Sequence, residues 1–464
     1  MTSTDSRLPD LRRNPFDWSP LGGLVMRPWY DRCALHLVAG WYLPLSRAWA
    51  AALANGGDEA GFAQSAGLAS FPGGLVGRSL QGAIAKTLRR HDRHKAADGH
   101  WLETYFASRV PGDRDLVEAE QQRIDTASSL MTARMGFLMA RRRIPAVRWQ
   151  VRAPDHLELP ETGHGDAGTC ISLPVPPDCA LPAVEESHPV LGPYGREYWL
   201  RFASPGGTGD TAWARVFEPE GVDNPPTLIS LHGIGMEVDD WRDAVDSAPT
   251  LTRRGLRVIR PQGPWHGRRR IAGCYGGEPA MSLGPEGFIK LFAGWGAEVG
   301  VLVDWARRNG SARVALGGVS LGALTSQLTA VAATAWPESM RPDCLLLVAT
   351  SGDLLGVATA GSLSAAVGYP EALARAGWTQ ADLERCLPLA EPRGPTAMPA
   401  QRIVVVLGEA DTVTPFAGGL ALARRWGVPP ENLFIRRQGH FSVSLDLCRQ
   451  PQPFDRLVAL LNSD

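Results

Sequence analysis

A serine stands between two glycines in the stretch VALGGVSLGALTSQL, residues 314–328. An apolar, β-rich run precedes Ser320, and a helix-like run of small residues follows it. A strand that turns into a helix within about two residues strains the backbone at the serine and holds the hydroxyl at the positive end of the helix. This arrangement favours a nucleophile, although a serine that only caps the helix would have similar neighbours.

Two further residues complete a candidate catalytic set. A serine hydroxyl is a poor nucleophile at neutral pH and needs a base, usually a histidine that a carboxylate orients. Asp411 follows the apolar run RIVVVLG, and His440 follows the run NLFIRRQ. Because the carboxyl ends of parallel strands meet at one edge of a sheet, both side chains are expected beside Ser320. Glu409 remains an alternative acid, and an aspartate here would also suit a turn.

The elements that must position these residues lie between residues 194 and 464. Short apolar runs alternate there with helix-like segments, which predicts an α/β fold with a mainly parallel sheet and helices on both faces. The first two runs, EYWLRFAS and TAWARVFEP, are expected to form an antiparallel pair at the edge. Residues 351–400 interrupt the alternation and are expected to form a small cap. Its apolar residues would line an acyl pocket or pack a lid: Leu354, Leu355, Val357, Leu363 and Leu373.

The residues also resemble a known family. The chain order serine, aspartate, histidine and the motif G-x-S-x-G at Gly318–Gly322 are similar to those of the α/β-hydrolase superfamily, in its serine esterase-like branch. Gly408–Pro415 matches the superfamily's G-x-x-D-x-x-x-P segment, and Gly439–His440 matches its G-H pair. The resemblance covers residues 195–464.

The resemblance implies an oxyanion hole made of two backbone N–H groups. The first would belong to Leu321, next after the nucleophile. The second would come from Ile234 or Gly235 in the loop HGIGM. His232 begins this loop, and it is expected to anchor the loop rather than to act as a base.

The segment PQGPWHGRRRIAGCYGG, residues 261–277, departs from the superfamily pattern, which often has an acidic, glycine-rich turn at this point. Its residues Trp265, His266 and Arg268 join His232 as candidate substrate-binding residues. Arginines in this position would suit a substrate carboxylate. The alternative is that the arginines pair with the N-terminal region, as runs of charge more often do.

Residues 1–155 show no family resemblance and are expected to be mostly helical, with helices near 79–92 and 118–143. Residues 156–193 are rich in proline and glycine and are expected to be a linker. The apolar segment 34–54 approaches the length of a membrane span, but Pro44 and Arg47 interrupt it. A buried helical hairpin broken at Pro44 is therefore expected, and membrane association is kept as an alternative.

Composition excludes several function classes. The 464 residues include 47 basic and 48 acidic ones, so nothing in the net charge indicates a nucleic-acid partner. The seven cysteines are odd in number, widely spaced and without a CxxC pair, which suits a reducing compartment such as the cytoplasm. The N-terminus lacks the pattern of a signal peptide.

These observations predict a serine hydrolase that cleaves a small-molecule carboxylic ester through an acyl-enzyme, with no metal and no organic cofactor. The same residues would serve an acyltransferase, lactonase, thioesterase or amidase. A membrane-associated lipase and a non-catalytic binding protein on a hydrolase fold are further alternatives. The sequence makes no prediction of the oligomeric state.

Overall fold

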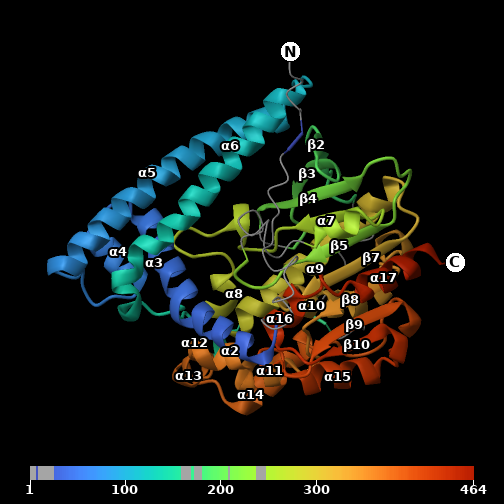
Figure 1. Ribbon diagram of the computed structural model, residues 1–464. Helices are drawn as coiled ribbons and strands as arrows, with labels where there is room; N and C mark the ends of the chain where they lie inside the picture. Colours follow the sequence, from blue (N-terminus) through green and yellow to red (C-terminus); the bar gives the residue numbers. More distant parts are fainter. Residues whose placement is uncertain are drawn as a thin grey trace.

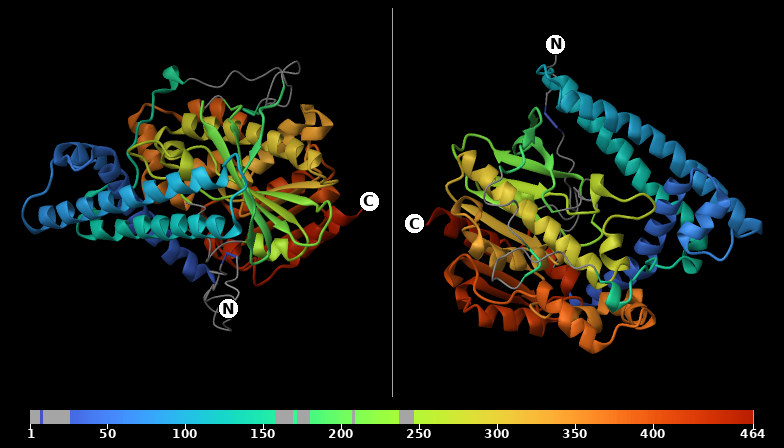
Figure 2. Two further views of the ribbon diagram at one scale, coloured as in Figure 1. Left: turned by 90° about the horizontal axis from the view of Figure 1, so that it is seen from above. Right: turned by 180° about the vertical axis from the view of Figure 1, so that it is seen from behind.

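The computed structural model places a large twisted sheet between two layers of helices, with a long helical hairpin beside it (Figures 1 and 2). The structure describes residues 7–8, 26–157, 169–171, 180–206, 209–236 and 247–463. Half of the expected linker, residues 158–168 and 172–179, lies outside the described residues.

The sheet runs in the order β1-β3-β4-β6-β5-β7-β8-β9-β10, and β2 pairs with β3. From β6 to β10 neighbouring strands are parallel, whereas β4 is antiparallel to both β3 and β6. The predicted mainly parallel sheet is therefore confirmed. The strands are β1 Glu185–Glu186, β2 Val190–Gly192, β3 Gly195–Ala203, β4 Thr211–Pro219, β5 Thr227–Leu231, β6 Arg257–Pro261, β7 Val314–Val319, β8 Cys344–Val348, β9 Ile403–Gly408 and β10 Leu433–Arg436.

The predicted edge of the sheet needs a correction. β1 and β2 lie inside the segment that we expected to be a linker, and both pair with the outer side of β3. Strands of two and three residues are too short to give a periodic pattern, so the sequence does not reveal them.

Alternate residues along each central strand face opposite layers, as the period of a strand requires. Leu316 of β7 and Leu345 of β8 pack into one hydrophobic cluster with helices α9 and α10. Ala315 and Leu346, one position away, pack into a second cluster with α7 and α17. These helices are α7 Ala248–Thr252, α9 Pro285–Arg308, α10 Leu321–Ala332 and α17 Gln452–Asn462. Both faces of the sheet are thus buried, which explains why its strands read as continuous apolar runs.

The expected cap consists of four short helices between β8 and β9, drawn in orange in Figure 1. They are α11 Leu354–Ala360, α12 Ser362–Val367, α13 Tyr369–Arg375 and α14 Gln380–Cys386. Three further helices follow strand ends: α8 Glu278–Ser282, α15 Phe416–Arg425 and α16 His440–Leu445.

The described N-terminal residues are mostly helical. The long helices α5 and α6 form an antiparallel hairpin that projects beside the sheet (Figure 1). The elements are α2 Pro28–Leu37, a π-helical turn Val38–Tyr42, α3 Leu43–Asn55, α4 Glu59–Ala66, α5 Gly74–Tyr105, α6 Asp113–Thr132 and a 3₁₀ helix Ala133–Arg143. The helix expected over residues 118–143 therefore changes type at residue 133. The 3₁₀ segment packs tightly on α5, since a Cβ on Gly136 would lie 3.0 Å from Cβ of Ala83.

The hairpin expected at Pro44 is wrong, because the chain continues as one helix from α2 through the π turn into α3. The N–H of Leu43 bonds to the carbonyl of Val38, five residues back. Pro44 is the second residue of α3, which follows the π turn directly, and a π bulge is one of the ways in which a helix accommodates a break in its i→i−4 hydrogen bonds. Residues 43–52 are buried against the other N-terminal helices. Among the described residues, no helix is both long enough and apolar enough to cross a membrane.

Candidate active site

Ser320 occupies a strained turn between β7 and α10. Its φ of 54° and ψ of −117° lie outside the regions that L-residues prefer. Two positions of this turn, Gly318 and Gly322, must also be glycine because a side chain there would have no room. A Cβ on Gly318 would lie 2.3 Å from the carbonyl carbon of Gly322, and a Cβ on Gly322 would lie 2.3 Å from the carbonyl oxygen of Leu231. The small residues therefore allow the helix to approach the strands closely enough to expose the hydroxyl at the edge of the sheet.

The structure brings Ser320, His440 and Asp411 into one hydrogen-bonded chain. Nε2 of His440 lies 2.9 Å from Oγ of Ser320, and Nδ1 lies 2.8 Å from Oδ2 of Asp411. The three residues follow the carboxyl ends of β7, β10 and β9, as expected. When Nδ1 carries the proton and donates to the carboxylate, Nε2 is left to accept the proton of the serine hydroxyl.

The carboxylate of Asp411 is held by its own turn. Oδ1 accepts hydrogen bonds from the backbone N–H groups of Val413 and Thr414, at 2.9 and 3.0 Å. The hydroxyl of Thr414 lies 2.9 Å from Oδ2. Asp411 is buried, whereas the alternative acid Glu409 is exposed. The structure thus places the carboxylate of Asp411, and not that of Glu409, against the imidazole.

The loop 232–236 lies over Ser320. A Cβ on Gly233 would lie 3.8 Å from Cβ of Ser320, and Ile234 lines the pocket beside the hydroxyl. The N–H of Gly235 donates to Nε2 of His266, at 3.3 Å. Of the two expected donors in this loop, Gly235 already has an acceptor, which favours Ile234 as the partner of Leu321 in an oxyanion hole.

His232 and His266 hold this loop rather than line the pocket. Nε2 of His232 accepts the N–H of Gly263, at 3.1 Å, and the two imidazole rings lie 4.7 Å apart. Burial lowers the pKa of His232 well below its usual value, and neighbouring His266 lowers it further. Hydrogen bonds to both rings therefore link the loops that follow β5 and β6.

Arg268 and Trp265 also lie away from the pocket. Arg268 forms a two-pronged ion pair with Asp98 of α5, with Nη1 3.0 Å from Oδ2, and its guanidinium covers the ring of Trp101. Trp265 packs half-buried against the core of the sheet. The arrangement fits the expected alternative, in which Arg268 pairs with the N-terminal region, and it does not favour a site for a substrate carboxylate.

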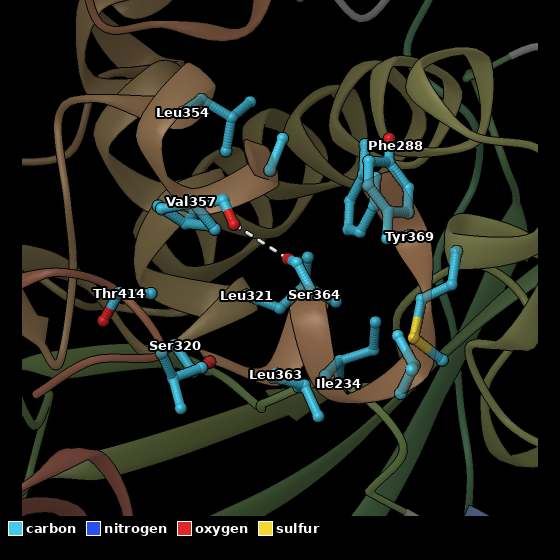
Figure 3. Close-up of a pocket in the computed structure, with 15 residues that line it drawn as sticks. Ile234, Phe288, Ser320, Leu321, Leu354, Val357, Leu363, Ser364, Tyr369 and Thr414 are labelled. Atoms are coloured by element: carbon cyan, nitrogen blue, oxygen red, sulfur yellow. Dashed lines mark hydrogen bonds between the residues drawn. The ribbon is translucent and has the colours of Figure 1, made fainter. Parts of the chain in front are cut away.

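A mostly apolar cavity of about 80 Å³ opens beside Ser320 (Figure 3). The cap supplies one wall, where Leu354, Val357 and Leu363 line the space as expected, whereas Leu355 and Leu373 do not. Phe288 and Tyr369 lie at the end opposite Ser320 (Figure 3). The lining residues are Ile234, Met281, Phe288, Ser320, Leu321, Leu324, Leu354, Val357, Ala358, Leu363, Ser364, Val367, Tyr369, Val413 and Thr414.

Two side chains of the N-terminal region contact the site, and the sequence did not indicate them. The hydroxyl of Tyr42 donates to the carbonyl of Gly235, at 2.8 Å, and itself accepts from Nη1 of Arg134. The carboxylate of Asp31 bonds to the backbone around His440. A single tyrosine or aspartate in a helix carries no motif, so only the packing of the N-terminal helices reveals these contacts.

No known family model matches the chain, and no curated protein matches its sequence. Solved structures that resemble it include acetyl xylan esterase 1 from Thermoanaerobacterium sp. JW/SL YS485, at 16% identity over 58% of this chain and 89% of that one, with a TM-score of 0.41. An esterase from Pyrobaculum calidifontis is 16% identical over 58% and 85% of the two chains, with a TM-score of 0.39. A puromycin-hydrolyzing peptidase from Mycobacterium tuberculosis is 19% identical over 61% and 40%, with a TM-score of 0.39.

The fold follows from features of the chain itself. Parallel strands from β6 to β10 are flanked by the antiparallel β4, and the serine of a G-x-S-x-G motif stands on a strained strand-to-helix turn at the edge of the sheet. An aspartate and then a histidine follow the serine in chain order, after β9 and β10. With this sheet, this turn and this order of residues, the chain has the α/β-hydrolase fold.

Proposed function

We propose that the protein is a serine hydrolase that cleaves carboxylic esters through an acyl-enzyme on Ser320. The observation that carries the proposal is the hydrogen-bonded chain from Ser320 through His440 to Asp411, beside an apolar cavity. A base within 3 Å of a hydroxyl, itself oriented by a buried carboxylate, is the arrangement that activates a serine.

In the first half of the reaction, Oγ of Ser320 attacks the ester carbonyl while Nε2 of His440 takes the hydroxyl proton. The backbone N–H groups of Leu321 and Ile234 would stabilise the charge that develops on the carbonyl oxygen. The leaving alcohol departs with the proton from His440, and the acyl group remains on Ser320.

In the second half, His440 removes a proton from water, which attacks the acyl-enzyme and releases the carboxylic acid. The side chain of Asp411 stabilises the imidazolium that forms in each half. Residues of the chain and water are sufficient for every step.

The cavity favours a short, uncharged acyl group. Apolar side chains form most of its wall, and its volume of about 80 Å³ is roughly half that of an engineered apolar cavity of about 150 Å³ that holds benzene. Phe288 and Tyr369 line the end opposite Ser320. We expect acyl chains of a few carbons to be preferred.

A fluorophosphonate probe and a series of p-nitrophenyl esters from acetate to octanoate test the proposal. The probe should label the wild-type protein on the peptide that contains Ser320, and not on the one that contains Ser364, the second serine of the cavity. Ser320→Ala should abolish labelling and ester turnover. A folded wild-type protein that neither reacts with the probe nor cleaves any ester would support the non-catalytic alternative.

Acyl transfer, lactone opening and thioester or amide cleavage use the same residues and are separated by the acceptor and the substrate. Added alcohols or amines would capture the acyl group in a transferase, and parallel assays with a lactone, a thioester and an anilide would rank the other activities. The membrane-associated lipase gains no support, since residues 43–52 of the segment that suggested it are buried against other helices.

A further inference from the structure

Asp31, on the first described helix of the chain, makes four hydrogen bonds to the segment that carries His440. Its Oδ1 accepts the backbone N–H groups of Phe441 and Ser442, at 2.6 and 3.0 Å. Its Oδ2 accepts the N–H of Gly439, at 3.2 Å, and the hydroxyl of Ser442. One carboxylate thus binds residues on both sides of His440, more than 400 positions away in the chain.

Two of these bonds satisfy N–H groups at the start of a helix, those of Phe441 and Ser442. The N–H of Gly439 is shared between Asp31 and the hydroxyl of Ser442, which lies 3.0 Å away. His440 is the first residue of α16, a helix of six residues, and the first N–H groups of a helix have no partner within it. A negatively charged group at this end also interacts favourably with the helix dipole. Asp31 therefore serves as the cap of α16, from a helix that belongs to another region of the fold.

The close approach of Asp31 to Gly439 is a second, steric feature of this contact. Its φ of −100° is open to any residue, so the backbone conformation does not require glycine. A Cβ at this position would, however, lie 2.4 Å from Cγ of Asp31. The glycine before His440 is therefore needed for room, and the group that needs the room is the carboxylate of Asp31.

The same N-terminal helix contacts the opposite side of the site. Tyr42, in the π turn that continues α2, donates to the carbonyl of Gly235 in the loop that holds Ile234. Near the other end of α2, the carbonyl of Met26 accepts from the side chain of Gln438, at 3.3 Å. Residues 26–42 thus contact both the histidine segment and the loop over Ser320.

We propose that Asp31 is a positioning residue that fixes the imidazole of His440 between Ser320 and Asp411. The proposal rests on the proposed hydrolase function. Its reason is geometric: a catalytic group must be held within about 0.5 Å of its working position, and a displacement of about 1 Å can lower the rate by about 100-fold. The carboxylate of Asp31 holds the backbone on each side of His440 and so limits where its ring can lie.

Two substitutions of Asp31 should lower kcat to different extents. Asp31→Ala removes the four hydrogen bonds and should lower kcat by about 100-fold, because the His440 segment is no longer held. Asp31→Asn keeps the shape and one acceptor oxygen but turns an N–H toward the segment, so its loss should be intermediate. KM should change less than threefold in both variants, since Asp31 does not line the cavity.

Asp58 offers a matched control. Its carboxylate also caps a helix of the N-terminal region, α4, by accepting the N–H groups of Ala60 and Gly61 at 3.0 and 3.1 Å. α4 lies away from the catalytic edge of the sheet (Figure 1). Asp58→Ala should lower the melting temperature but leave kcat within twofold of wild type.

Two readouts separate positioning from a general loss of structure. The rate of fluorophosphonate labelling should fall with kcat in Asp31→Ala while circular dichroism stays native. The NMR signal of the Nδ1 proton of His440, which is expected far downfield in the wild type, should broaden or disappear in Asp31→Ala and remain in Asp58→Ala.

The inference would be overturned by a folded Asp31→Ala variant that keeps the wild-type kcat, labelling rate and downfield proton signal. Failure of the proposed function would look different, because the wild-type protein itself would then lack labelling and ester turnover. The downfield signal would still report in that case whether Asp31 orders His440.

Discussion

Nδ1 of His440 lies 2.8 Å from Oδ2 of Asp411, while the carboxylate of Glu409, two residues earlier in the chain, is exposed. Both acids follow β9 closely, and the sequence left the choice between them open. The turn from Asp411 to Thr414 decides it, because the N–H groups of Val413 and Thr414 hold the Asp411 carboxylate against the imidazole.

Replacing the two acids should therefore have unequal effects. Asp411→Asn should lower kcat by about 10³- to 10⁴-fold, because an amide favours the wrong tautomer of the histidine and no longer stabilises its charged form. Glu409→Gln should change kcat less than twofold. Steady-state ester hydrolysis measures both, with circular dichroism to verify the fold. The assignment is wrong if Glu409→Gln is the damaging change.

Tyr42→Phe tests the contact between the N-terminal helix and the loop over Ser320. The variant loses one hydrogen bond to the carbonyl of Gly235, which is worth about 1 kcal/mol, so kcat should fall about fivefold. Tyr275→Phe is the control, since its hydroxyl donates to the carbonyl of Ala146, also at 2.8 Å. Equal kcat values for the two variants would show that the loop does not depend on Tyr42.

Phe288→Ala should shift the acyl preference toward longer chains. The phenyl ring lies at the end of the cavity opposite Ser320, so its removal lengthens the space. The ratio of kcat/KM for octanoate to that for acetate should rise by about tenfold or more, which corresponds to about 1.4 kcal/mol for the added contact. An unchanged profile across the ester series would place the acyl group elsewhere.

His232→Gln should reduce the dependence of stability on pH. His232 is neutral in the folded protein because burial, and then His266, lower its pKa well below the usual value of about 6.5. The unfolded chain binds a proton at this residue below about pH 6.5, so the wild-type free energy of unfolding decreases as the pH falls from there.

One proton of difference corresponds to about 1.4 kcal/mol per pH unit. Urea unfolding at pH 7.5, 6.5 and 5.5 should therefore show a shallower slope for His232→Gln than for the wild type, by up to this amount. The two curves would run parallel if His232 did not titrate on unfolding.

Gly439→Ala should act through Asp31. Its methyl group would lie 2.4 Å from Cγ of Asp31 and displace the carboxylate, so kcat should fall as it does in Asp31→Ala. Because both changes break the same contact, the double variant should be little worse than the more damaging single variant. Fully additive losses, measured as kcat in a double-mutant cycle, would contradict this coupling.

Local patterns were enough to predict eight strands of the sheet, though not the short strands β1 and β2 or the spatial order of the strands. The central strands are apolar on both faces, and helices of ten or more residues separate several of them, so a mainly parallel sheet could be inferred without tertiary information. The strained turn at Ser320 was equally local, since Gly318 and Gly322 stand on either side of the serine. The positions of Asp411 and His440 after their strands then followed from the geometry of a parallel sheet.

Packing between distant segments could not be predicted. Asp31 and Tyr42 contact the site only because a helix from the N-terminal region crosses the edge of the sheet, and neither residue lies in a motif. Of the two interpretations of Arg268, the structure fits the one in which it pairs with the N-terminal region, but the sequence could not identify the partner, Asp98, which lies 170 positions earlier. A break at Pro44 was expected, but the helix continues because a π turn just before the proline accommodates it. A π turn has no sequence signature.

The continuous helix from Pro28 to Asn55 also affects whether the two parts of this protein can work when they are separated. The residues proposed for the reaction all come from residues 194–464, but the arrangement they need is completed by a segment near the other end of the chain. A fragment limited to residues 194–464 would keep Ser320, Asp411 and His440, but it would lose the contacts that hold them in their relative positions. Two fragments that are each inactive should therefore regain hydrolysis when they are combined, because the N-terminal helices complete the arrangement of the residues proposed for the reaction.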